Sequence, residues 1–216
     1  MFDTVTVIGA GRAGSTIAAR LRERGVDVRP GGQLRLLCVP DRAIAEVAAG
    51  IERGPWVAHV SGGTPLVALD PHERRFSVHP LQTLTVDGGA GQLDGAWGAV
   101  TAETADAHSH ALWLAETLGL RPFVLADDKR ALYHAGASMA SNFLVTLYRA
   151  AERLFEDAGA PPAALIPLMK RTIENDFDLT GPIARGDWET VERHVAALDG
   201  TGLEPLYSAL AEATRA

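Results

Sequence analysis

Residues 5–14 read VTVIGAGRAG. The first four residues are β-branched, and the next six contain three glycines spaced as G-x-G-x-x-G. Such a run followed by glycine predicts a buried strand and a tight turn. The helical spacing of Ile17, Ala18 and Leu21 then predicts a helix that ends at Gly25. Strand, glycine turn and helix in this order are typical of a domain that binds a dinucleotide.

In such a turn each glycine has its own task. Gly9 would make the tight bend, Gly11 would let a pyrophosphate approach the backbone, and Gly14 would let helix and strand pack closely. The N-terminus of the helix offers free N–H groups and a partial positive charge. We therefore expect Gly9, Gly11, Arg12, Ala13 and Gly14 to bind the cofactor. The alternative is a glycine turn that binds no ligand.

Arg29 stands near the end of a possible short second strand, residues 26–29. An arginine at this place suits the 2′-phosphate of NADP, so the sequence favours NADP over NAD. A merely solvated Arg29 is the alternative.

The connection after Arg29 is very short, because residues 30–33 alone separate it from the next expected strand, residues 34–39. Five Cα steps span at most about 17–18 Å, whereas two full-length parallel strands flanking the first one would require about 20 Å. We therefore predict a shortened sheet edge, with a second strand that is vestigial or pairs differently. Dinucleotide binding should then be weaker than in a complete domain, or lost.

Strands and helices alternate as far as residue 125, which predicts an α/β domain with a Rossmann-like parallel sheet covered by helices. Beyond it the pattern is all helical, with a first helix expected over residues 129–158. The sequence thus predicts a dinucleotide-binding domain at residues 1–126 and a helical substrate and dimerisation domain at residues 127–216. The further expected strands are residues 56–60, 76–79, 97–102 and 121–125.

Composition excludes several classes of protein. A formal net charge of −7 argues against binding to nucleic acid. No apolar run approaches the roughly 20 residues that a membrane-spanning helix needs. The single cysteine, Cys38, lies in an apolar strand-like stretch and excludes an internal disulfide framework and a cysteine-rich zinc site. No other motif indicates a metal, and the early first strand without a cationic leader makes a cytoplasmic protein the expectation.

Longer motifs carry a specific resemblance: HPLQT at residues 79–83, YHAGAS at 133–138, SNFLV at 141–145 and LTGPIARGD at 179–187. Together they resemble a family of bacterial Rossmann-like oxidoreductases with a C-terminal helical domain of unknown function. That family belongs to the 6-phosphogluconate dehydrogenase-like superfamily, with ketopantoate, pyrroline-carboxylate and prephenate reductases and dehydrogenases. The resemblance implies an NADP-binding N-terminal domain and a helical domain that closes the substrate site and pairs with a second subunit, so we expect a homodimer.

Four polar residues of the expected helix, His134, Ser138, Ser141 and Asn142, are spaced to share one face. They form either the wall of a substrate pocket or a set of hydrogen bonds between helices. Relatives such as 6-phosphogluconate dehydrogenase place a catalytic lysine and an asparagine four residues apart on the comparable helix. By spacing, Ser138 takes the place of the lysine and Asn142 that of the asparagine, and a serine cannot act alone as a general acid near neutral pH.

His134 and His79 are therefore the best candidate proton donors, since imidazole titrates near neutral pH. His79 ends a strand of the cofactor domain, and its His-Pro pair resembles a motif of prephenate dehydrogenases in which the histidine contacts substrate. Either histidine alone could instead be a structural or solvated residue. For His59 we expect such a structural or solvated role. Arg185 could bind a substrate carboxylate with two hydrogen bonds.

These residues favour an NADP-dependent oxidoreductase that acts on a carbonyl or imine of a small carboxylate substrate. The alternative is a non-catalytic, dimeric Rossmann-like protein, with a ligand-binding or regulatory role, that has lost normal dinucleotide binding. The short connection after Arg29 and the absent lysine favour this alternative, whereas the retained His79, His134, Asn142 and Arg185 favour the enzyme.

Overall fold

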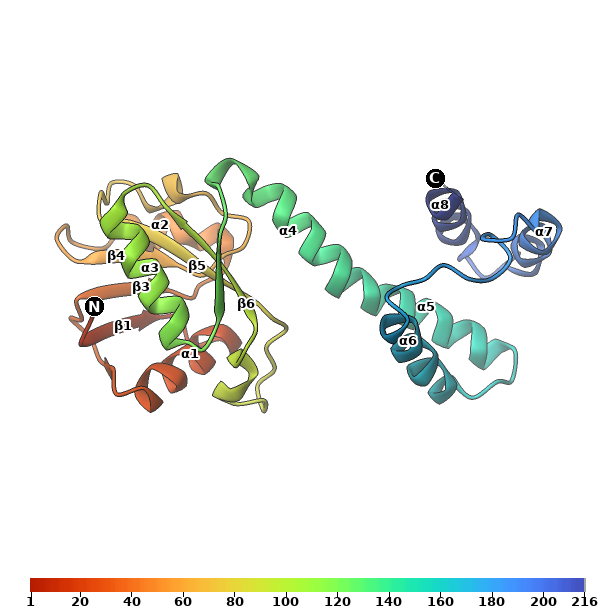
Figure 1. Cartoon of the computed structure of the whole chain (residues 1–216), viewed down its shortest axis with the longest axis horizontal. Coiled ribbons are helices and arrows are strands. Elements are labelled where there is room, and N and C mark those ends of the chain that lie inside the picture. The colour runs from red at the N-terminus through yellow and green to blue at the C-terminus, as the bar shows by residue number, and fades with distance from the viewer. Residues whose placement is uncertain (216) are drawn as a thin grey trace. The chain divides into compact units, whose positions relative to one another are not determined.

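The computed structural model describes residues 1–215 and divides the chain into two compact units, Met1–Ser141 and Asn142–Ala216 (Figure 1). The first unit holds a seven-stranded sheet in the order β2-β1-β3-β4-β5-β6-β7. β5 and β6 pair antiparallel, and the other five neighbouring pairs are parallel. The strands are β1 (Thr4–Ile8), β2 (Asp27–Val28), β3 (Leu34–Leu37), β4 (Trp56–His59), β5 (Arg75–Leu81), β6 (Trp97–Ala102) and β7 (Arg121–Val124).

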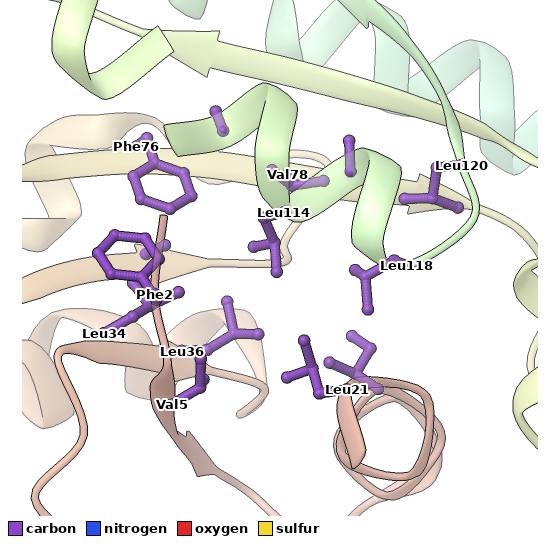
Figure 2. Packing of buried hydrophobic residues seen from close by; sticks show 14 of the residues in the cluster. Phe2, Val5, Leu21, Leu34, Leu36, Phe76, Val78, Leu114, Leu118 and Leu120 are labelled. Carbon is purple, nitrogen blue, oxygen red and sulfur yellow. The ribbon is translucent and has the colours of Figure 1, made fainter. Parts of the chain in front are cut away.

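Both faces of the sheet are covered. On one face the strands pack against α1 (Arg12–Glu23) and α3 (Ala105–Thr117), where Leu21, Phe76 and Leu114 are fully buried (Figure 2). On the other face a smaller apolar cluster lies under α2 (Ile44–Ala49) and the 3₁₀ turn η2 (Leu66–Leu69). Each large apolar side chain buried in this way stabilises the fold by about 1.5–3 kcal/mol. The first unit is therefore the predicted α/β domain.

The predicted shortening of the sheet edge is confirmed. β2 has two residues and pairs with β1 beside Thr4 and Val5, while β3 begins opposite Val5 on the other side of β1. The chain between them crosses β1 directly instead of forming a helix. Gly32 lies so close to β1 that a methyl group there would stand 2.7–2.8 Å from backbone atoms of Val5 and Thr6.

The sequence predicts a parallel sheet, but one pair of neighbouring strands is antiparallel. β6 runs antiparallel to β5, with Ser77 opposite Thr101. The physical reason is the connection: residues 82–96 contain only a 3₁₀ turn, Ala90–Leu93, and no crossover helix that could carry the chain back to start a parallel strand.

The expected helix over residues 129–158 forms over nearly its whole length, with one π-helical stretch inside it. α4 (Arg130–Ser138) continues through a π-helical stretch, Met139–Phe143, into α5 (Leu144–Asp157). The compact first unit, Met1–Ser141, includes α4 and so ends later than residue 126, the boundary predicted from the sequence. The second unit adds α6 (Leu165–Glu174), α7 (Trp188–Ala197), capped by Asp187, and α8 (Glu204–Arg215).

Among residues 1–215, none of the helices combines the length and apolar character needed to cross a membrane. In the same part of the chain, no three histidine, cysteine, aspartate or glutamate side chains gather in a group able to hold a metal ion.

Candidate functional site

The glycine turn joins β1 to α1 at the point where the sheet grows away from β1 in both directions. Gly9 has φ +115°, a conformation that side chains disfavour, and a methyl group on it would overlap the carbonyl oxygen of Cys38. A methyl group on Gly14 would overlap the carbonyl oxygen of Gly9. These two glycines therefore let strand, turn and helix approach closely, as the motif predicts.

Gly11 is different, because a methyl group there would meet no atom within 4 Å. It is the N-cap of α1 and supplies no side-chain cap, so the first N–H groups of the helix receive no hydrogen bond from a capping side chain. Arg12 is exposed and Ala13 is partly exposed beside it. A pyrophosphate fits such a cradle, since backbone N–H groups and the helix dipole both favour an anion.

Arg29 is exposed at the shortened edge and pairs with Asp27, its Nε lying 2.8 Å from Oδ2. Its backbone is held in place because the Thr6 hydroxyl donates to the Arg29 carbonyl at 2.8 Å and accepts from Gly32 N–H at 2.9 Å. The guanidinium is thus presented to solvent at the sheet edge, but with a carboxylate beside it.

The loops after β3 and β4 are tied together at the same end of the sheet. The Ser61 hydroxyl donates to a carboxylate oxygen of Asp41 at 2.8 Å, and it accepts from the N–H groups of Gly63 and Thr64 at 3.2 and 3.0 Å. This hydroxyl fixes the turn that places Gly62 next to β5.

Two of the predicted site residues, His79 and His134, meet at this turn. Their ring centroids lie 5.9 Å apart in an edge-to-face arrangement. Gly62 is buried between them, and a methyl group on it would stand 2.7 Å from His134 Cδ2 and 2.8 Å from His79 Cε1. The histidine of a strand end and the histidine of α4 therefore form one cluster.

Tyr133, which the sequence had not singled out beyond its place in a motif, completes the cluster. Its hydroxyl lies 2.8 Å from Nδ1 of His79, and its ring packs edge-on against His79 and Phe123. Burial raises the pKa of Tyr133 to about 12, although the nearby Arg130 charge opposes this. The hydroxyl therefore keeps its proton near neutral pH.

Arg130 anchors α4 to the sheet, a role that was not predicted from the sequence. Its side chain is 1% exposed and donates to Thr101 Oγ1 at 2.8 Å, to Ser77 Oγ at 3.0 Å and to the carbonyl of Ser61. Its Nε has no hydrogen-bond partner in the described chain and lies 4.0 Å from Asp127 Oδ1. Because Arg130 ties two strands, β5 and β6, and the Ser61 turn to α4, it sets the positions of Tyr133 and His134.

The surroundings keep two histidines neutral. Burial, the Arg130 charge and His79 lower the pKa of His59 to about 3. Burial, His134 and Arg130 lower the pKa of His79 to about 4, although Asp41 acts in the opposite direction. At neutral pH His79 is therefore an uncharged imidazole, whereas the proton donor predicted from the sequence would be the charged imidazolium.

The predicted polar stripe on one helix face does not continue as expected. His134 and Ser138 lie on α4, but Ser141 and Asn142 lie in the π-helical stretch, whose i→i+5 hydrogen bonds change the residues per turn. The Ser141 hydroxyl donates to the carbonyl of Ala137 at 2.8 Å, and Asn142 is exposed and begins the second unit. Arg185 is exposed within that second unit.

The C-terminal part of the chain identifies its family. Residues 96–214, more than half of the chain, match the family described as a domain of unknown function, DUF2520. The chain belongs to the DUF2520 family. The matched part of this DUF2520 protein includes Arg130, Tyr133 and His134, whereas the glycine turn and His79 precede it. The predicted membership in a Rossmann-like family with a helical domain of unknown function is confirmed.

Solved structures similar to this DUF2520 chain span nearly all of it. A Bacteroides fragilis protein described as an NADP oxidoreductase is 20% identical with a TM-score of 0.83, covering 98% of this chain and 97% of that one. A Thermotoga maritima protein is 24% identical with a TM-score of 0.78, covering 98% and 96%. A 1-pyrroline-5-carboxylate reductase from Streptococcus pyogenes is 14% identical with a TM-score of 0.62, covering 98% and 96%. These likenesses confirm the fold, and no curated protein sequence matches the chain.

Proposed function

We propose that this protein is an oxidoreductase that uses a nicotinamide dinucleotide. The glycine turn carries the proposal: Gly9 and Gly14 pack against backbone, while Gly11 leaves the N-terminus of α1 open to a pyrophosphate. The names of similar structures, an NADP oxidoreductase and a pyrroline-carboxylate reductase, support it. When bound, the nicotinamide would supply or accept a hydride.

NADP is the proposed form of the cofactor. Arg29 is exposed at the edge of β1 and can bind a 2′-phosphate, provided that it exchanges Asp27 for the phosphate. NAD remains the second choice, because Asp27 on the two-residue β2 is a carboxylate of the kind that binds a ribose hydroxyl.

The proposed substrate is a small carboxylate that carries a carbonyl or an imine. His134, beside His79 at Gly62, is the proposed proton donor. Ser138 and Ser141, which belong to the same unit as His134, are proposed to line the substrate site.

Thermal unfolding with added dinucleotide tests the proposal, because a ligand that binds only the folded state raises the melting temperature. We expect NADPH to stabilise the protein more than NADH, and Arg29→Ala to reduce the NADPH effect more than the NADH effect. Equal losses would remove Arg29 from the 2′-phosphate role. The absence of any shift at millimolar dinucleotide would refute the oxidoreductase.

The second candidate is a ligand-binding or regulatory protein without catalysis. It is favoured by the two-residue β2, which leaves little strand to support the adenosine half of a dinucleotide. NADPH binding without turnover of any carbonyl or imine substrate would favour this candidate.

A homodimer through the helical unit is part of the proposal. α5 has no buried residue, although its sequence is strongly amphipathic. Several large apolar side chains of the second unit are 40–71% exposed, and a second copy would cover them. They are Phe143, Leu144, Val145, Ile166, Leu168, Ile173, Phe177, Leu179 and Leu210.

A further inference from the structure

The imidazole of His79 has different neighbours at its two nitrogens. Nδ1 lies 2.8 Å from the hydroxyl of Tyr133. The opposite edge of the ring, Cε1 and Nε2, faces Gly62, where a methyl group would stand 2.8 and 2.9 Å from these atoms. The Nε2 side is therefore the side of the ring that faces the loop after β4 and His134.

The hydrogen bond to Tyr133 selects one tautomer of a neutral ring. A phenol is a stronger acid than a neutral imidazole, and an imidazole nitrogen is a stronger base than a phenol oxygen, so the O–H donates and Nδ1 accepts. The pKa of Tyr133, raised to about 12, keeps that proton on the hydroxyl, and the pKa of His79, lowered to about 4, leaves a single proton on the ring. With Nδ1 accepting, this proton is on Nε2.

We propose that Tyr133 is a positioning residue that holds His79 as the Nε2–H tautomer, so that a neutral imidazole donates a hydrogen bond to the substrate's carbonyl oxygen. The second half of this inference rests on the proposed function. As negative charge develops on that oxygen during reduction, the N–H stabilises it without giving up its proton. His79 then polarises the carbonyl, and the proton of the product comes from another group. The nearby His134 is the candidate for this group.

Arg130 and Asp41 influence the same ring from other elements. Arg130 lies on α4 one turn before Tyr133, and its positive charge disfavours a second proton on His79, as His134 does, while Asp41 favours one. The packing of Tyr133 against Phe123, with ring centroids 5.9 Å apart, does not need the hydroxyl. Tyr133→Phe therefore removes the hydrogen bond and keeps the packing.

Nitrogen NMR of the full chain labelled at histidine measures the tautomer directly, without cofactor or substrate. His79→Gln assigns the two ring signals of His79. At neutral pH we expect a protonated Nε2 and an unprotonated Nδ1 in the wild type, with well separated shifts. In Tyr133→Phe the two shifts should move toward each other, because both tautomers become populated.

A matched control exists in the second unit, where the hydroxyl of Tyr207 lies 2.7 Å from Nδ1 of His194. Tyr207→Phe should move the signals of His194 and leave those of His79 in place. A wild-type His79 protonated on Nδ1, or unchanged His79 shifts in Tyr133→Phe, overturns the tautomer inference even if NADPH binds. The expected NMR result combined with no dinucleotide binding supports the tautomer and refutes the proposed function instead.

Discussion

Replacing Gly11 and Gly14 separately by alanine distinguishes the binding role of the glycine turn from its packing role. A methyl group at Gly11 meets no atom within 4 Å, whereas one at Gly14 overlaps the carbonyl oxygen of Gly9 and stands 2.9 Å from its carbonyl carbon. Gly11 has φ −72°, which alanine adopts freely. The two substitutions add the same methyl group on either side of Arg12 and Ala13, so they are matched chemically.

The magnitudes follow from these contacts. At an N-cap, alanine is worse than glycine by about 0.5–1 kcal/mol, and the less flexible unfolded chain offsets about 0.4–1 kcal/mol of this. Gly11→Ala should thus shift the melting temperature by less than about 4 °C, taking about 2–4 °C per kcal/mol. Gly14→Ala forces a side chain into backbone and should cost about 3 kcal/mol, or about 6–12 °C.

Binding should show the reverse order. A methyl group at Gly11 occupies space that a pyrophosphate needs, and we expect NADPH to bind at least about tenfold more weakly, a loss of about 1.4 kcal/mol. At a concentration 100 times the wild-type Kd, stabilisation by NADPH should fall from about 2.7 to about 1.4 kcal/mol. Thermal unfolding with and without NADPH measures both effects. Wild-type stabilisation of Gly11→Ala by NADPH would show that the pyrophosphate does not rest at this turn.

Three further predictions follow from the site and the helical unit. Arg130→Met leaves Ser77, Thr101 and the Ser61 carbonyl without their donor and should lower the free energy of unfolding in urea by about 3 kcal/mol. The control Arg149→Met, at an exposed side chain, should change this free energy by less than about 0.5 kcal/mol. Similar losses in the two variants would refute the anchoring role of Arg130. Because the pKa values of His59 and His79 are held at about 3 and about 4, the unfolded chain binds more protons below pH 6.5, so stability should fall between pH 6.5 and about 4, by up to about 1.4 kcal/mol per pH unit for each ring. The loss should be smaller in His59→Gln, and equal urea midpoints of the wild type at about pH 7.5 and about pH 5 would contradict this. Sedimentation velocity should show a dimer, and Leu168→Glu, at a side chain that is 61% exposed, should shift it toward monomer; a monomeric wild type would refute the dimer.

The parts of the fold that depend on local pattern could be predicted from the sequence. The glycine turn follows from residues 5–14 and the short edge from the four residues after Arg29, because turn chemistry and chain length act locally. The alternation of strands and helices follows in the same way from the hydrophobic pattern as far as residue 125. The antiparallel β6 could not be predicted in the same way. Its direction depends on whether residues 82–96 form a crossover helix, and a glycine-rich stretch gives no helical period to decide this.

The candidate site shows the same limit. His79 and His134 stand out singly as titratable residues in motifs, but their meeting at Gly62 requires α4 to return to the strand ends. That return depends on Arg130, which bonds to residues 29, 53 and 69 positions earlier in the chain. No periodicity records contacts at such separations. The one signal in the sequence was an arginine at the start of a helix, three residues before Tyr133. This signal does not identify an anchor, because an arginine at an exposed helix end gives the same pattern.

The short crossing of the chain at Gly32 affects the binding of the cofactor but not the proposed reaction site. Residues 29–33 replace a helix and part of a strand, and they bond to Thr4 and Thr6 of β1, so the edge is a fixed structure in its own right. Its consequence falls on the adenosine half of a dinucleotide, where β2 offers two residues and Arg29. The pyrophosphate turn and the His79 cluster lie on other strands and keep their own supports in Gly14, Ser61 and Arg130. A weak cofactor affinity would thus be compatible with an intact reaction site, and affinity alone is a poor criterion for choosing between enzyme and non-enzyme. Turnover at saturating NADPH is the better criterion.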